Sequence, residues 1–463
     1  MNRRSKFFSG TLIGLVVGCH GAATAQTSLC QETAKLVPES GAYYDYFGHS
    51  VSVSGSLALV GVPQDDDSGQ DSGSAYVFSV PAGERLAKIV APDGQAGDQF
   101  GYSVAISGNT AVIGAPYDDD TAAGAGSAYL FDLSDPGAPE VIAKIQASDA
   151  ELGDQFGWSV AIADGVALVG SFLDWDNGPW SGSAYLFDAR TGTQLAKLLP
   201  DDGQRDDNFG FAVGISGAVA IVGAPYDSDN GVDSGSAYLF DVATGSQIDK
   251  LLPSNSAADN RFGQAVAVSG SRAIVGAFRN SDVDDRAGCA YLFDSFTGVE
   301  QSIIYASDGA RVDFYGSSVA ISGTLAVIGA VFADHQGTNA GTAYLLDVSE
   351  PASPFELAKF IASDGAPHDN LAWSVAISGA TSIAGAYKDD DFVTDSGSAY
   401  LFDNLACWGC VADWNHDGSV NTQDFLAYLR SWAAGDGLAD LTRDGVIDTR
   451  DFILYLSRWA SGC

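Results

Sequence analysis

Residues 100–132 read FGYSVAISGNTAVIGAPYDDDTAAGAGSAYLFD. Two apolar, β-branched runs are joined by the short turn Ser107-Gly108, and an acidic loop leads into a third run. A fourth short run follows after another turn. Short β-branched or aromatic runs bounded by Gly, Pro and Asp predict strands. The four expected strands are Phe100–Ile106, Ala111–Pro116, Gly126–Asp132 and Ala143–Ile145.

The same order of elements recurs seven times along the chain. An aromatic residue followed by glycine opens six copies, and the seventh opens with Leu371-Ala372. Neighbouring openings are 53 residues apart four times and 56 residues apart twice. Four strands per copy and seven copies predict a seven-bladed β-propeller. The six aromatic openings are Phe47-Gly48, Phe100-Gly101, Phe156-Gly157, Phe209-Gly210, Phe262-Gly263 and Tyr315-Gly316.

A strand near the N-terminus is expected to close the ring. The last copy ends at Phe402-Asp403 without a fourth strand of its own. Residues Ala34–Val37 precede the first copy and match the fourth-strand sequences Ala87–Val90 and Ala196–Leu199. We therefore expect this N-terminal strand to complete the last blade, which removes an open sheet edge. The expected fold class is an all-β seven-bladed β-propeller, followed by a small helical segment near the C-terminus.

The aromatic-Gly openings and segments such as Gly114-Ala115-Pro116 resemble FG-GAP repeats, which occur in the propeller of integrin α-subunits. The resemblance spans about residues 30 to 404. It implies a propeller fold but not one function, because propellers have many functions. Calcium-binding members of the family carry an acidic loop between the first two strands. Here only a short turn such as Ser54-Gly55 stands there, so that calcium site is not expected.

Acidic residues gather instead in the loops between the second and third strands. The loops from one blade into the next are also acidic, as at Asp93 and Asp98. Because the strands are antiparallel, both loop sets should emerge on one face, where long loops usually carry binding residues. Two interpretations stay open: the carboxylates hold calcium, or Asp simply suits turns and solvent. The main loops are Asp65–Asp67, Asp118–Asp120, Asp174 with Asp176, Asp227 with Asp229, and Asp389–Asp391.

Two matching stretches near the C-terminus have the twelve-residue spacing of EF-hand calcium loops. Glycine at the sixth position, Gly418 and Gly445, permits the sharp turn, and the seventh position supplies a backbone carbonyl. We therefore predict Ca²⁺ as the cofactor. The expected ligands are Asp413, Asn415, Asp417, Ser419, Asn421 and Asp424 in the first loop, and Asp440, Thr442, Asp444, Val446, Asp448 and Asp451 in the second.

Each loop leads into an amphipathic helix, with Phe425, Tyr428 and Trp432 in the first matching Phe452, Tyr455 and Trp459 in the second. The paired loops and helices, about residues 411 to 460, resemble a dockerin domain, a small all-α, EF-hand-like module. The Gly462-Cys463 ending resembles one dockerin variant. This resemblance implies a cohesin-like partner, and it places the partner contacts at Thr422, Gln423, Thr449 and Arg450.

The cysteines suggest two disulfides. Cys410 and Cys463 bracket the C-terminal module, so we expect them to pair, and ring closure should bring Cys30 near Cys407. Cys289 stands where other copies carry a small residue, so a buried free thiol is expected.

The N-terminus has the pattern of a signal peptide. Arg3, Arg4 and Lys6 precede the apolar run Phe7–Gly18, and Ala23–Ala25 offers a cleavage site. Lipid attachment at Cys19 is the alternative. We therefore assign residues 1–25 to a leader, 26–406 to the propeller and 407–463 to the dockerin-like module. A secreted or cell-surface location follows, and no stretch is apolar enough for a transmembrane helix.

The charge and the motifs narrow the function. Asp and Glu outnumber Lys and Arg by 59 to 22, so nucleic acid and anionic lipid are not expected partners. The sequence carries no G-x-S-x-G, H-E-x-x-H or phosphate-loop motif, so no catalytic residues are assigned and an enzyme is not expected. We expect a scaffold or binding protein whose propeller binds an unknown protein or glycan. A cell-surface adhesin is the alternative, and a carbohydrate-active enzyme is the third choice.

Overall fold

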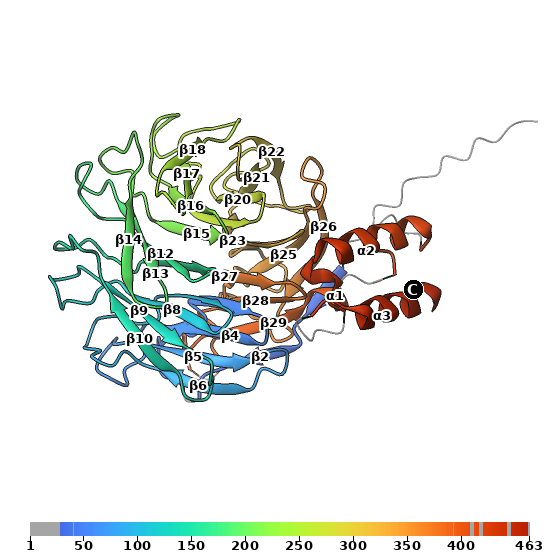
Figure 1. Ribbon diagram of the computed structural model, residues 1–463, viewed down its shortest axis with the longest axis horizontal. Coiled ribbons are helices and arrows are strands. Elements are labelled where there is room, and N and C mark those ends of the chain that lie inside the picture. Colours follow the sequence, from blue (N-terminus) through green and yellow to red (C-terminus); the bar gives the residue numbers. More distant parts are fainter. Residues whose placement is uncertain are drawn as a thin grey trace, which may run out of the picture.

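The computed structural model describes residues 28–39, 41–391, 393–407, 412–415, 420–441 and 446–461. The strands of this part of the chain form seven sheets arranged as the blades of a propeller (Figure 1). In each blade the first strand faces the central channel, and the fourth strand is outermost except in blade 6, which has one further strand at its outer edge. None of the described helices is long and apolar enough to cross a membrane.

Blades 1 to 5 each consist of four consecutive antiparallel strands. Blade 1 contains β3 (Ser50–Ser54), β4 (Leu57–Val62), β5 (Ser74–Ser79) and β6 (Arg85–Ile89). Blade 2 contains β7 (Ser103–Ser107), β8 (Thr110–Ala115), β9 (Ser127–Asp132) and β10 (Glu140–Ile145). Blade 3 contains β11 (Ser159–Ala163), β12 (Val166–Ser171), β13 (Ser183–Asp188) and β14 (Thr193–Leu198). Blade 4 contains β15 (Ala212–Ser216), β16 (Val219–Ala224), β17 (Ser236–Asp241) and β18 (Gln247–Leu251), and blade 5 contains β19 (Ala265–Ser269), β20 (Arg272–Ala277), β21 (Cys289–Asp294) and β22 (Glu300–Ile304).

The N-terminal segment joins the last two blades. Strand β2 (Ala34–Leu36) pairs with β29 (Ser398–Asp403), so the predicted closure of blade 7 is confirmed. Strand β1 (Ser28–Gln31) was not expected: it adds to blade 6 in parallel with β26 (Phe355–Ile361). Blade 6 also contains β23 (Tyr315–Ser322), β24 (Leu325–Ala330) and β25 (Thr342–Asp347), and blade 7 contains β27 (Leu371–Ser378) and β28 (Thr381–Ala386).

The aromatic-Gly pair explains one error in the expected strands. Strand β7 begins at Ser103 rather than at Phe100, because Gly101 adopts a φ of 90° and turns the chain. Phe100 is fully buried and its ring packs edge-on against Tyr129, with centroids 5.3 Å apart. A Cβ on Gly101 would collide with the carbonyl of Ser74 on blade 1. The pair therefore anchors each blade and lets its neighbour approach closely.

Two helices follow the propeller at the C-terminal positions expected for them: α2 (Thr422–Ala434) and α3 (Thr449–Ser461). The rings of Tyr428 and Tyr455 stack between them with centroids 3.9 Å apart. Trp432 Nε1 donates to the carbonyl of Asp448 at 3.0 Å, and Trp459 Nε1 donates reciprocally to the carbonyl of Asn421 at 2.8 Å. The helices therefore form a pseudo-twofold pair. The short helix α1 (Asn404–Cys407) follows the last propeller strand, and η1 (Gly437–Ala439) lies between α2 and α3 in the chain.

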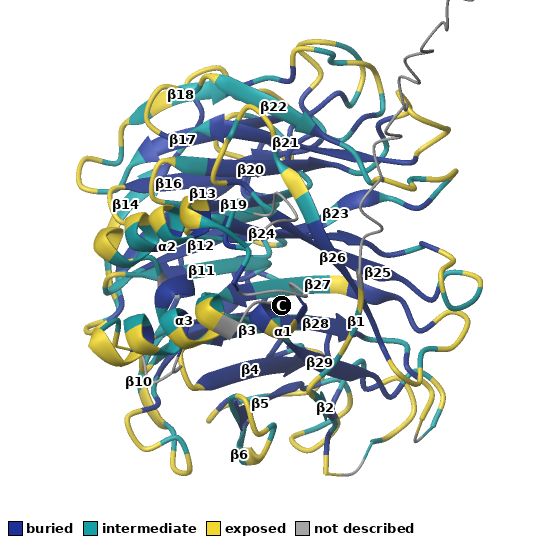
Figure 2. Cartoon of the chain, turned by 90° about the vertical axis from the view of Figure 1, so that its right-hand side faces the viewer, coloured by how far each residue is buried: buried dark blue, intermediate teal, exposed yellow. Residues whose placement is uncertain are grey.

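The helical pair lies on the propeller face that carries the short turns (Figures 1 and 2). Cys407 of α1 forms a disulfide with Cys30 of β1, which is the predicted pairing. Thr324, in the turn between β23 and β24, donates from Oγ1 to Asp436 Oδ2 at 3.3 Å. Cys289 is a buried free thiol, as expected. Cys410 and Cys463 lie outside the described residues, so their predicted pairing remains a prediction.

Candidate functional site

The acidic loops converge on lysine side chains from the outermost strands. In blade 2, Lys144 Nζ lies 2.9 Å from Asp93, 2.8 Å from Asp118 and 2.6 Å from Asp120. The hydroxyl of Tyr129 lies 2.8 Å from Asp93 and 3.0 Å from Asp118. Burial lowers the pKa of Lys144, but hydrogen bonds to Asp118 and Asp120 outweigh burial and hold it above its ordinary range. Each such group of a lysine and its carboxylates is called a lysine cluster below.

Six blades contain a lysine cluster. In blade 7 the lysine comes from β2, so ring closure also completes this cluster. Within the described residues no group of three or more His, Cys, Asp or Glu side chains is arranged to hold a metal. In the loops of these six blades, the cation beside the carboxylates is the ammonium group of a lysine. The other clusters are Lys88 with Asp65 and Asp67, Lys197 with Asp149, Asp174 and Asp176, Lys250 with Asp202, Asp227 and Asp229, Lys359 with Asp308, and Lys35 with Asp364, Asp389 and Asp391.

Blade 5 lacks the lysine and also lacks two of the carboxylates. Ile303 pairs in register with Tyr291, where Lys250 pairs with Tyr238 in blade 4. Asn255 and Asn280 replace the two aspartates that contact the tyrosine hydroxyl in most other blades. Asn255 Oδ1, for example, accepts a hydrogen bond from the hydroxyl of Tyr291 at 2.6 Å. Loss of the cation is thus matched by loss of negative charge, as expected if the clusters are neutralised internally.

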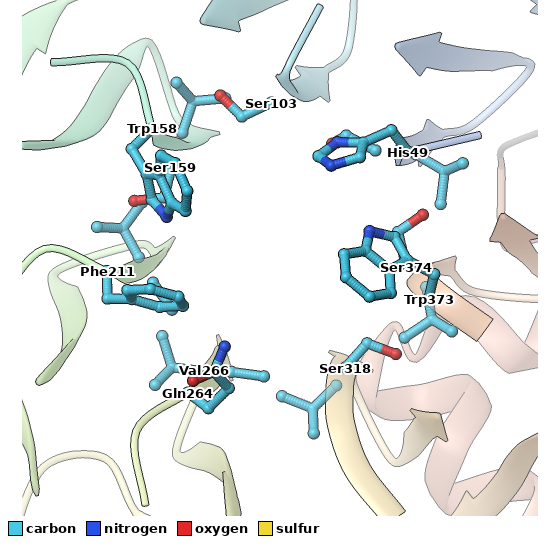
Figure 3. Close-up of a pocket in the computed structure, with 18 of the residues that line it drawn as sticks. His49, Ser103, Trp158, Ser159, Phe211, Gln264, Val266, Ser318, Trp373 and Ser374 are labelled. Atoms are coloured by element: carbon cyan, nitrogen blue, oxygen red, sulfur yellow. The ribbon is translucent and has the colours of Figure 1, made fainter. Parts of the chain in front are cut away.

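The mouth of the central channel lies on the face of the long loops. It encloses a cavity of about 280 Å³, lined by three consecutive residues from each of the seven blades (Figure 3). The first of the three follows the aromatic-Gly pair and forms the outermost ring, here called the mouth ring. Below it lie mostly serines and then seven valines. The mouth ring consists of His49, Tyr102, Trp158, Phe211, Gln264, Ser317 and Trp373.

Five neighbouring blades place aromatic side chains in the mouth ring, and together these form the aromatic arc, which runs from Trp373 through His49, Tyr102 and Trp158 to Phe211. Successive ring centroids are 5.9, 4.7, 4.6 and 5.7 Å apart. Blades 5 and 6 interrupt the arc with Gln264 and Ser317. The repeated fold is therefore asymmetric at its mouth, as Figure 3 shows for the labelled residues.

The mouth carries little charge. Burial lowers the pKa of His49 to about 4, so its imidazole is neutral near pH 7. Nδ1 lies 3.0 Å from the carbonyl of Tyr102, which fixes the hydrogen on Nδ1 and leaves Nε2 as an acceptor. The serine hydroxyls below are used between blades, for example Ser103 Oγ donates to Gly157 O at 2.8 Å. What remains open to a ligand is an aromatic wall with a few polar groups.

In the C-terminal module, the aspartates at the twelfth loop position lie at the helix starts. Asp424 and Asp451 are fully buried. Asp424 accepts from the backbone N–H groups of Asn415 at 3.1 Å and Asn421 at 2.6 Å, and Asp451 accepts from that of Asp448 at 2.8 Å. These bonds hold each loop against its helix. Of the other expected ligands, Asp413, Asn415, Asn421, Asp440, Val446 and Asp448 are described, whereas Asp417, Ser419, Thr442 and Asp444 lie outside the described residues.

The expected partner contacts are accessible. Thr422, Gln423, Thr449 and Arg450 are all exposed in the first turns of α2 and α3. Arg450 forms an ion pair with Asp448, with Nη2 2.8 Å from Oδ2. One expected partner residue therefore contacts one expected calcium ligand.

The mouth ring and the lysine clusters were not predicted from the sequence. A signal for each was present in the repeats: the residue after the aromatic-Gly pair is aromatic in five copies, and an Ala-Lys pair recurs in fourth strands. The rings of the mouth ring lie on different repeats, and each lysine lies far in sequence from most of the aspartates it contacts. Only an alignment of the repeats with one another makes these two positions visible.

Comparison with known proteins agrees with this architecture. The chain matches the FG-GAP repeat in seven segments, residues 30–78, 84–131, 140–187, 193–240, 246–293, 299–346 and 355–402. Most segments begin at the outermost strand of one blade and end at the third strand of the next. A search of curated proteins finds no match. Because the seven segments cover most of the chain and coincide with the blades, the chain belongs to the FG-GAP repeat family.

Proposed function

We propose that this protein is an exported binding protein that holds a saccharide at the mouth of its propeller and attaches to a partner through its C-terminal helices. The observation that carries the proposal is the aromatic arc, in which five blades of a repeated fold place rings side by side around one cavity. Apolar cavities with a few polar groups are the usual form of ligand sites.

A saccharide suits the chemistry of the mouth. Sugar rings have apolar faces that pack on aromatic side chains and hydroxyl edges that bond to groups such as Gln264 and His49 Nε2. Two further exposed tryptophans, Trp175 and Trp180, lie in the long loop of blade 3, on the same face as the mouth. A cationic ligand is less well supported, because lysines neutralise many carboxylates of these loops.

Binding is favoured over catalysis. Among the residues that line the mouth there is no carboxylate, and general acid–base chemistry on sugars ordinarily needs a pair of them. His49 donates to a backbone carbonyl rather than to a partner side chain. We therefore propose that the protein is not an enzyme.

The test of the ligand site is a glycan binding screen with the mature protein, followed by titration of the best ligand. We expect Trp158→Ala to weaken binding at least about fivefold, since aromatic truncation at a ligand contact costs about 1–3 kcal/mol. Phe296→Ala is the matched control, because Phe296 is an exposed ring in the turn after β21, on the short-turn face. Equal binding by wild type and Trp158→Ala would contradict the proposal.

The C-terminal module is proposed to bind two Ca²⁺ ions and a cohesin-like domain through Thr422, Gln423, Thr449 and Arg450. The buried Asp424 and Asp451, each at the end of an EF-hand-like loop, support this proposal. After exhaustive chelation, calorimetry should give a stoichiometry near two for wild type and near one for Asp424→Ala. No heat at millimolar calcium would contradict both calcium binding and the dockerin assignment. A cell-surface adhesin is the alternative if the leader is lipidated at Cys19.

A further inference from the structure

Lys388 is the one lysine of the described residues that belongs to no lysine cluster. Its Nζ lies 5.3 Å from the ring centroid of Tyr387. The ring of Tyr387 packs 4.5 Å from Trp373 and 6.1 Å from His49, so the lysine stands beside one end of the aromatic arc. No carboxylate of the described residues lies within ion-pair distance of it. Asp395 is close enough to interact electrostatically with Lys388, but it forms no ion pair with the ammonium, so the ammonium remains free to pair with an external acid.

The arginines of blade 5 stand beside the other border of the polar gap. Arg279 occupies the same repeat position as Lys388, two residues after the end of the second strand, and lies 5.4 Å from the ring centroid of Phe278. Arg261 stacks at 3.7 Å on Tyr226, whose ring is 6.4 Å from Phe211. At this repeat position the remaining blades carry only uncharged residues: Gln64, Tyr117, Leu173, Tyr226 and Phe332.

This group of arginines has a surplus of positive charge and of hydrogen-bond donors. Arg261, Arg279 and Arg286 share Asp259, and Arg261 also pairs with Asp233. Three guanidinium groups thus face two carboxylates. Nε and Nη1 of Arg261 and Nε of Arg279 are buried without a hydrogen-bond partner among the described residues. Unsatisfied charged donors are costly, and of these two arginines Arg279 is the one an external acid can reach, because its side chain is 31% exposed.

We propose that the ligand of the mouth is an acidic saccharide chain. Its sugar rings pack on the aromatic arc. Its carboxylate or sulfate groups pair with Lys388 and Arg279, on either side of the gap formed by Gln264 and Ser317. This inference rests on the proposed function and names its ligand class. In a chain with a formal charge of −37, Lys388 and Arg279 place positive charge beside aromatic rings near the mouth. Charge-assisted hydrogen bonds are the strong ones, and they discriminate an acid from a neutral analogue.

The experiment compares ligands that differ only in charge. Oligogalacturonate and its methyl ester share one backbone, and a sulfated galactan oligosaccharide and its desulfated form make a second pair. Each is titrated into the mature wild-type protein and into Lys388→Met, Arg279→Met and Arg190→Met. Arg190 is exposed in the turn between β13 and β14 on the opposite face, so its substitution controls for net charge. Melting temperatures verify that each variant is folded.

We expect the charged member of one pair to bind at least tenfold more tightly than its neutral partner. Lys388→Met and Arg279→Met should each reduce that ratio about tenfold and leave binding of the neutral form unchanged, whereas Arg190→Met should not alter it. A charge-dependent affinity for the oligogalacturonate pair identifies carboxylate as the acid group, and one for the galactan pair identifies sulfate. Equal binding of charged and neutral forms, or a ratio unchanged in both variants, overturns the inference while the proposed function stands. No binding of any saccharide overturns both.

Discussion

The ammonium of Lys35 lies 2.9 Å from a carboxylate oxygen of Asp389, although 354 residues separate the two in sequence. Lys35 is on the N-terminal strand and Asp389 is in the last long loop, so the pair joins the two ends of the ring. Asp389 is almost fully buried and would be left without a cation if the lysine were removed.

Lys35→Met should therefore destabilise the propeller by about 3 kcal/mol, since breaking a buried ion pair leaves an uncompensated charge. Urea unfolding of wild type and variant measures the difference. Lys144→Met is the control, because it removes the same cluster in a blade that does not close the ring. If Lys35 contributes to closure, amide exchange in β2 and β29 should accelerate only in Lys35→Met. A loss below about 1 kcal/mol in both variants would contradict a stabilising role for the clusters.

Blade 5 offers a charge exchange. Asn280 is almost fully buried, so Asn280→Asp alone should cost about 1–3 kcal/mol, because it buries a carboxylate without a cation. Adding Ile303→Lys places an ammonium at the register position of the other lysines and should restore much of the loss. A double-mutant cycle by chemical unfolding measures the coupling. Strictly additive effects would show that the two positions do not form a pair.

The disulfide between Cys30 and Cys407 should stabilise the folded ring by about 2–4 kcal/mol, since it restricts the unfolded chain. Cys30→Ser with Cys407→Ser should lower the melting temperature in non-reducing buffer. Cys289→Ser is a matched control, because the equivalent position is serine in five other blades and the thiol is free. A larger loss in the control than in the double variant would contradict this expectation.

Stability should increase as the pH falls from 8 to 5. Burial raises the pKa of Asp207 and of Asp369 to about 7, above the ordinary value of 3.8. The folded state therefore binds protons more tightly than the unfolded state between about pH 4 and pH 7, and protonation in this window favours folding. Melting curves at several pH values measure the slope, which Asp207→Asn with Asp369→Asn should flatten. If the melting temperature of the double variant changes with pH as steeply as that of the wild type, other groups cause the pH dependence.

Much of the fold follows from the repeats alone. The spacing of the aromatic-Gly pairs predicts seven blades, and the match of Ala34–Val37 to fourth strands predicts the closure that β2 makes. Strand β1 could not be predicted, because its four residues resemble no other copy and pair in parallel with an edge that the repeat leaves free.

The candidate site was less accessible from sequence for a physical reason. His49, Tyr102 and Trp158 differ chemically, and only the circular arrangement of first strands brings the ring of Tyr102 within 5 Å of each of the other two. The acidic loops were visible in the sequence, but their neutralisation depends on lysines that lie on a different strand. The sequence alone therefore does not show that a lysine lies beside the carboxylates of these loops.

The pairing of β2 with β29 has a consequence for biosynthesis. The ribosome makes β2 (Ala34–Leu36) near the start of the propeller and its partner β29 (Ser398–Asp403) at the end, so β2 waits for almost the entire propeller to be synthesised. Until then the nascent chain has an unpaired edge at each end, which is where misassembly with other chains begins. A chain terminated prematurely anywhere before residue 398 cannot close. The absence of unpaired strand edges at the two ends of the ring therefore distinguishes a full-length propeller from a truncated one, which gives cellular quality control a structural criterion.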